Sequence, residues 1–201
     1  MPRTYVWQAY YLAFTGQFND SMAAINCALQ LDPLSLPVNR SAAELFYFAG
    51  RFDESIDQFQ KSIEMDPQHS VAHLELGRVY EHREMYDAAI AEFAKARDLT
   101  HDSAESLASL ARCHAVSGKD GDALALLRDL TALSERQYVS PFDLALIHGG
   151  LGQKEKCFEC LDRAYEIHDA WMIYITVDPR WRRLRGDAKF AKVVRRVGLP
   201  Q

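Results

Sequence analysis

A pattern of 34 residues passes through this chain five times in succession without an insertion or a deletion. One small residue recurs in each copy, at Ala9, Ala43, Gly77, Ala111 and Ala145. A second small column follows at Ser21, Ser55, Ala89, Ala123 and Cys157. Bulky apolar residues recur with the same 34-residue spacing at Ile25, Phe59, Phe93, Leu127 and Leu161, and again at Leu31, Met65, Leu99, Leu133 and Ile167. A fixed period of this length is typical of a solenoid, in which each unit buries its apolar face only against its neighbours. The pattern therefore predicts a binding scaffold and not an enzyme.

Composition and cysteine usage narrow the class further. With 48% hydrophobic and 25% charged residues, the chain has the composition of an ordered protein. No apolar stretch reaches the roughly 18 to 20 residues that a membrane span needs. The first residues, MPRTYVWQAYYLAF, are predicted to form a helix and not a signal peptide. The four cysteines lack a disulfide framework spacing, which suits reduced thiols and predicts a cytoplasmic protein; they are Cys27, Cys113, Cys157 and Cys160.

Each period contains two runs of helix length, separated by turn signals. Gly16, Gly50, Gly118 and Gly152 follow the first runs and are suited to the left-handed conformation that closes a helix. The third period has Glu84 at this position. Asp-Pro after the second run, at 32–33 and 66–67, ends one helix before the next begins. These signals predict helix pairs at 3–15 and 18–31, 37–49 and 52–65, 70–83 and 86–99, 103–117 and 120–133, and 140–151 and 154–168.

The columns of small and apolar residues resemble a known family. Small residues at slots eight, twenty and twenty-seven, an aromatic at slot seventeen and proline at slot thirty-two resemble the tetratricopeptide repeat. The third unit is the nearest match, with Leu76, Gly77, Tyr80, Tyr86, Ala89, Phe93 and Ala96. Departures from the pattern are Gln8, Ala42, His114, His148 and Leu130.

This resemblance implies an all-α fold, a right-handed α-solenoid of helix-turn-helix units with a C-terminal helical cap. The expected division is five repeats over 1–168 (1–34, 35–68, 69–102, 103–136 and 137–168), followed by capping helices over 169–201. In the cap, Asp178-Pro179 is expected to break a short apolar run at 170–177. Asp187 is expected to cap a last helix at 188–197 that buries Phe190, Val193, Val194 and Val197.

The C-terminal part, from 138 onwards, is also similar to the closing segment of tetratricopeptide arrays in bacterial multidomain regulators. In those proteins the array follows a DNA-binding, kinase, cyclase or propeller domain. The residues of this chain contain none of those domains. The resemblance therefore implies either a fragment of such a regulator or a free-standing relative.

The concave groove is the first candidate site. In tetratricopeptide arrays the first helix of each pair lines a groove that holds a peptide. The corresponding slots of this chain hold Tyr10, Arg40, Glu44, Tyr47, Arg78, His82 and Arg112. Arg78 and Arg112 lie one repeat apart and are expected about 10 Å from each other, a spacing suited to two carboxylates of an acidic peptide. The alternative is that both arginines are paired locally, since Glu75 and His82 lie within helical reach of Arg78.

The aromatic first helix is the second candidate. Tyr5, Trp7, Tyr10, Tyr11 and Phe14 cannot all face one partner helix, so some of them are expected to be exposed. An exposed apolar stripe indicates an interface with an upstream repeat, a second copy of the chain or a ligand. The alternative is an ordinary first helix with amphipathic tyrosines at its rim.

The charge distribution sets a basic C-terminal segment against an acidic body. Residues 180–196 hold eight basic side chains and one acid, a net charge of +7, against −12 for the residues before them. The basic side chains are Arg180, Arg182, Arg183, Arg185, Lys189, Lys192, Arg195 and Arg196. They could bind nucleic acid or anionic lipid. No nucleic-acid module is recognisable and the chain as a whole is acidic, so a solvated cap or an acidic protein partner is favoured.

Other motifs favour packing over chemistry. Cys157 and Cys160 form a CxxC inside a predicted helix, where Cys157 fills a packing column. His69 and His73 have metal-ligand spacing, but no carboxylate partner is evident. The glycines at 149–152 and 118–121 match neither a phosphate loop nor a calcium loop. We therefore expect no cofactor, no metal and no catalysis. The expected function is a scaffold for a protein or peptide partner, acidic where it meets Arg78 and Arg112. The alternative is an oligomerisation or docking module that uses the first helix.

Overall fold

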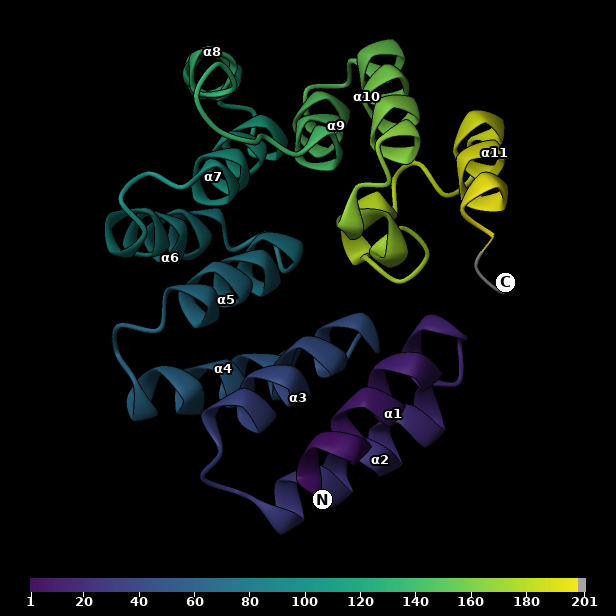
Figure 1. Ribbon diagram of the computed structural model, residues 1–201. Coiled ribbons are helices and arrows are strands. Elements are labelled where there is room, and N and C mark those ends of the chain that lie inside the picture. The colour runs from purple at the N-terminus through teal and green to yellow at the C-terminus, as the bar shows by residue number, and fades with distance from the viewer. Residues whose placement is uncertain (199–201) are drawn as a thin grey trace.

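The structure, a computed structural model, describes residues 1–198 and is helical, with no strand in that range. It is a right-handed α-solenoid of five helix pairs (Figure 1). The pairs are α1 (Pro2–Phe14) with α2 (Phe18–Leu31), α3 (Leu36–Phe48) with α4 (Phe52–Met65), α5 (Ser70–His82) with α6 (Tyr86–Leu99), α7 (Ala104–Val116) with α8 (Asp120–Leu133), and α9 (Pro141–Gly150) with α10 (Lys154–Glu166). Every predicted helix is present, with its ends displaced by at most two residues.

The turn within each pair is made as the sequence predicts. The glycines after the first helices adopt positive φ angles, for example 77° at Gly16 and 79° at Gly118. In the third pair Glu84 takes the same left-handed conformation, with φ 60°. A side chain with a Cβ is less favourable there. The backbone nevertheless repeats the turn, because the packing of α5 against α6 fixes it.

The two small columns form the seam inside each pair. All five residues of each column are buried. Where the second column is serine, its hydroxyl donates to the carbonyl of the first: Ser21 to Ala9 at 2.8 Å and Ser55 to Ala43 at 2.7 Å. The last apolar column behaves differently, because Leu31, Met65 and Ile167 are exposed at the ends of their helices.

The cap consists of η1 (Ala170–Tyr174), η2 (Pro179–Trp181) and α11 (Ala188–Val197). Asp169, Asp178 and Asp187 each accept a backbone N–H at the start of one of these helices. The expected capping role of Asp187 is therefore confirmed.

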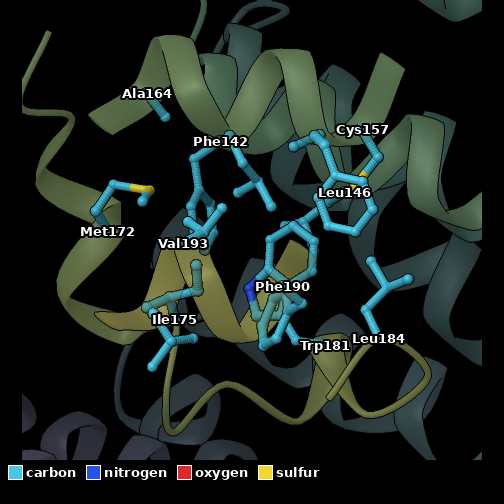
Figure 2. Close-up of a cluster of buried hydrophobic side chains, with 14 residues drawn as sticks. Phe142, Leu146, Cys157, Ala164, Met172, Ile175, Trp181, Leu184, Phe190 and Val193 are labelled. Atoms are coloured by element: carbon cyan, nitrogen blue, oxygen red, sulfur yellow. The ribbon is translucent and has the colours of Figure 1, made fainter. Parts of the chain in front are cut away.

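The cap forms a core with α9 and α10, which Figure 2 shows. Trp181 packs between Phe142 and Phe190 in this core. Of the residues that α11 was expected to bury, Phe190, Val193 and Val194 are buried, whereas Val197 is partly exposed at the edge of the core.

The cap also lies in the concave side of the array (Figure 1). Tyr174 of η1 packs against Phe14 of α1 and Phe48 of α3, with ring centroids 5.2 and 5.4 Å apart. The cap thus contacts both the last helix pair and the first two. In the described range, none of the helices has the length and apolar character needed to cross a bilayer.

The concave groove as candidate functional site

The first helices bring the predicted groove residues together on one side of the array. Tyr10 of α1 donates its hydroxyl hydrogen to Glu44 of α3, and Arg40 lies 3.3 Å from the same carboxylate. Further along, Tyr47 packs edge-on against His82 of α5, with centroids 6.1 Å apart. The period places these side chains in register, since their helices stack one behind another.

Arg78 does not face an open groove. Its guanidinium is 2.6 Å from Glu75 of its own helix and 2.8 Å from Glu105 of α7, and it lies 5.5 Å from the Trp171 ring of the cap. The residue is 4% exposed. The expectation of a guanidinium free for a partner is therefore wrong for Arg78, and the local pairing with Glu75 is confirmed. A buried charge is stable only when it is paired and hydrogen-bonded, which explains this arrangement.

Arg112 is buried in a similar way. It forms an ion pair with Glu81 of α5 and donates to the backbone carbonyl of Arg180, at 3.4 Å. Glu44 and Tyr47 are buried as well, so four of the seven predicted groove residues are covered. Tyr10, Arg40 and His82 remain partly exposed.

The cap supplies an ion pair of its own to the concave side. Arg180 donates to the Asp178 carboxylate from Nε at 2.9 Å and from Nη2 at 2.6 Å. Burial alone would raise the pKa of Asp178, but Arg180 and Arg112 outweigh it and hold this pKa below its ordinary value. The expectation that Arg180 belongs to a solvated basic surface is wrong, because its side chain is buried against Asp178.

Two acids near this cluster are shifted in the opposite direction. Burial raises the pKa of Glu75 to about 7, although Arg78 favours its charged form. Burial likewise raises the pKa of Asp143, on α9, to about 7. Around Arg78 and Arg180 the concave side is therefore a packed polar interior, in which burial favours the protonated forms of these two acids.

An opening remains where the two ends of the array meet. A cavity of ≈ 440 Å³ lies between the first two helix pairs and the cap. Its walls are mostly apolar, and they include Phe14, Phe18, Phe48, Val177, Phe190 and Val194. Arg185 is a charged residue of its lining, and Thr176 adds a buried hydroxyl that has no hydrogen-bond partner among residues 1–198. The cavity has the size and lining typical of a site for an apolar group.

The aromatic first helix divides as the sequence suggests. Tyr5, Tyr10 and Phe14 pack against the array or the cap, whereas Trp7 is 69% and Tyr11 66% exposed. The expectation that some of these rings are exposed is confirmed. Whether they contact a partner stays a prediction.

The remaining motifs have structural roles. Burial raises the pKa of the Cys157 thiol to about 12, the opposite of the shift that activates a redox cysteine. His69 accepts the Ala72 N–H at the start of α5, and His73 contacts Glu92 at 2.6 Å. No cluster of metal-ligating side chains exists within residues 1–198. In the basic segment, Arg196 pairs with Asp162, and Arg182, Arg183 and Arg185 are exposed.

Comparison with known proteins agrees with this architecture. Residues 40–104 match the family model of the tetratricopeptide repeat. This part of the chain therefore consists of tetratricopeptide repeats. A comparison with curated proteins gives no match.

Solved structures extend the likeness to most of the array. A thermophilic tetratricopeptide protein of Thermus thermophilus is 15% identical and has a TM-score of 0.68, over 96% of this chain and 99% of that one. TPR-like repeats from Podosopora anserina, assigned to a kinesin light chain, are 16% identical with a TM-score of 0.62, over 85% and 97% of the two chains. MamA is 17% identical with a TM-score of 0.55, over 81% and 95%. At these identities the likeness is one of fold.

Sequence reasoning missed the groove-filling role of Trp171, Tyr174, Asp178 and Arg180. These residues lie outside the 34-residue period, so no column marks them. The glutamates of the first helices give no signal for the cap either, because they pair with arginines of the same set of helices: Glu44 with Arg40, Glu75 and Glu105 with Arg78, and Glu81 with Arg112.

Proposed function

We propose that this tetratricopeptide array binds a segment of a partner protein on its concave side, between the first helix pairs and the cap. Tetratricopeptide folds are in general protein-interaction scaffolds. The proposed binding region consists of the groove-facing side of α1, α3 and α5 together with the adjoining cavity. It retains Tyr10, Arg40 and His82 from the predicted groove residues.

The observation that carries this proposal is the way the groove holds residues of its own chain. Trp171 lies over the Arg78 guanidinium, and Tyr174 packs on Phe14 and Phe48. A segment with aromatic side chains therefore already fits this side of the array. A partner segment of the same chemistry would make the same contacts.

Competition for the groove requires only a limited displacement. Trp171 and Tyr174 are partly exposed, whereas Met172, Ile175 and Trp181 are buried in the core of the cap. A partner needs to replace the two outward rings and can leave the cap core intact. The cavity beside Phe14 and Phe48 gives it a point of entry.

The charged side chains beside the cavity indicate the kind of partner. Arg185 lines the cavity, and the neighbouring Arg182 and Arg183 are exposed. We therefore expect a segment with one or two aromatic residues and an acidic residue beside them, because arginine favours carboxylates. Such a partner suits a cytoplasmic interaction protein without catalytic activity.

The chain's own segment is a defined probe for this site. A labelled peptide of residues 168–178 is added to the full chain, and its binding is followed by fluorescence anisotropy. In the unaltered chain, Tyr174 occupies the contacts that the peptide needs. Tyr174→Ala removes this competing side chain and is expected to strengthen peptide binding by about tenfold, because the site no longer has to release its own segment before it binds the peptide.

Ile173→Ala is the matched control, because Ile173 belongs to the same segment but is exposed. It is expected to leave binding as in the unaltered chain. Equal affinities for the Tyr174→Ala and Ile173→Ala chains, or no binding to either, would contradict a concave site that accepts such a segment.

A further inference from the structure

The exposed face of α1 occupies a position that is buried in every other repeat. Residues one period apart from Tyr11 are Leu45, Val79, Cys113 and Ile147, and all four are fully buried. Those one period apart from Trp7 are Ser41, Glu75, Ser109 and Asp143, which are buried too. In each later pair this face packs against the preceding pair. In α1 it is uncovered and carries two aromatic rings.

The residue types show that this face differs from an ordinary contact between repeats. The internal positions equivalent to Trp7 hold only short or acidic side chains. A tryptophan ring is far larger and would overpack a contact built at the same spacing. The α1 face is therefore unsuited to a helix pair stacked in the register of the other repeats.

Charge and composition favour a protein interface on this face. Arg3 is the single charged side chain of α1, although the chain carries a net charge of −5. Two copies can approach here with little repulsion between them. Tryptophan and tyrosine are enriched in the centres of protein interfaces, where they contribute much of the binding energy.

The opposite end of the array cannot accept this face. The downstream side of the last pair is covered by the cap, with Trp181, Leu184 and Phe190 packed on Phe142, Leu146 and Cys157. Among residues 1–198, the last pair therefore offers no free face for head-to-tail stacking in the register of the repeats. An isologous contact, in which both copies use the same face, does not need that end of the array.

We propose that α1 is a self-association surface and that two copies of this chain form a closed dimer through it, with Trp7 and Tyr11 at its centre. The two α1 helices pack across a twofold axis. This leaves the concave sides of both copies accessible, so the dimer is independent of the groove function proposed above. It presents two binding regions to a partner.

Sedimentation equilibrium over micromolar concentrations tests the dimer. The expected mass is twice the 22.9 kDa of the chain. Trp7→Glu and Tyr11→Glu, which place charges at the centre of the contact, are expected to return the mass to that of one chain. Leu34→Glu is the control, because Leu34 is an exposed apolar residue outside α1, and it should leave the dimer intact.

A cross-link tests the twofold geometry separately. Gln8 is exposed on the same helix, and Cys27 is the exposed native thiol. In a Cys27→Ser background, Gln8→Cys is expected to give a disulfide-linked dimer on mild oxidation, whereas Gln17→Cys should not. A single-chain mass at all concentrations, a dimer that survives Trp7→Glu, or masses that grow beyond two chains would each overturn the proposal.

Discussion

Tyr174 in the cap meets Phe14 in the first helix edge to face, with ring centroids 5.2 Å apart and planes at 86°. This contact joins the two ends of the array, which are separated along the chain by the whole length of the solenoid. Repeat arrays are stabilised mainly by contacts between neighbouring units. The Tyr174–Phe14 contact adds a long-range term that couples the first helix pair to the last.

A double-mutant cycle on Phe14 and Tyr174 measures this coupling. With Phe14→Ala and Tyr174→Ala, we expect a coupling free energy of about 0.5–1.5 kcal/mol, because an edge-to-face aromatic pair contributes that much beyond area burial. Urea unfolding of the four proteins gives the value. A cycle of Tyr11→Ala with Tyr174→Ala should give a coupling near zero, since Tyr11 is exposed elsewhere on α1.

Gly77→Ala is expected to destabilise the array, although alanine is the better helix former. A Cβ at Gly77 would lie 2.6 Å from Cε1 of Phe93, whose ring is fully buried. Overpacking of this kind costs about 1–3 kcal/mol, against a gain of about 1 kcal/mol in helix propensity. Chemical denaturation measures the difference. Gly149→Ala is the control, because its Cβ would meet Cys157 Sγ at an ordinary 3.5 Å; a loss at Gly149 as large as that at Gly77 would contradict the argument.

The regular part of the fold could be predicted from the sequence, and the filling of the groove could not. Most helix ends are marked by a local signal, such as Gly16 or Asp32-Pro33, and each seam is marked by a repeated small residue. The contacts Arg78–Trp171 and Phe14–Tyr174 join a repeating element to a segment that does not repeat. No period specifies such a contact, because it depends on the curvature of the whole superhelix. For that reason the sequence places the groove residues on the correct side of the array but does not show that the cap buries several of them.

Charge reversal at the groove arginines is a test of stability as well as of binding. If both arginines were exposed in an open groove, Arg78→Glu and Arg112→Glu would leave the helices intact. In the structure each reversal places a carboxylate beside Glu75 or Glu81 in a buried site. Breaking a buried pair in this way costs about 3–5 kcal/mol, so we expect a lower unfolding midpoint and loss of helicity.

The control for these reversals is an exposed pair. Arg83 lies 2.9 Å from Asp53, and both side chains are largely exposed. Arg83→Glu is expected to cost no more than about 1 kcal/mol, as surface ion pairs do. Circular dichroism during thermal unfolding compares the three variants. Unchanged stability of Arg78→Glu would show that the buried network is not needed for folding.

The pH dependence of stability should report the burial of Asp143. Burial raises the pKa of this carboxyl to about 7 in the folded chain, above its ordinary value of 3.8. Between these two values the folded state binds more protons than the unfolded state, so the free energy of unfolding falls as the pH rises. The decline reaches at most about 1.4 kcal/mol per pH unit for one group, and it ends above the folded pKa. Asp143→Asn removes this titration and is expected to flatten the difference in stability between acidic and mildly basic solution, as measured by urea unfolding. Asp129→Asn, at an exposed position on α8, should keep the slope of the unaltered chain. If Asp143→Asn and Asp129→Asn show the same pH dependence, the carboxyl of Asp143 is ionised in the folded protein and the shift is absent.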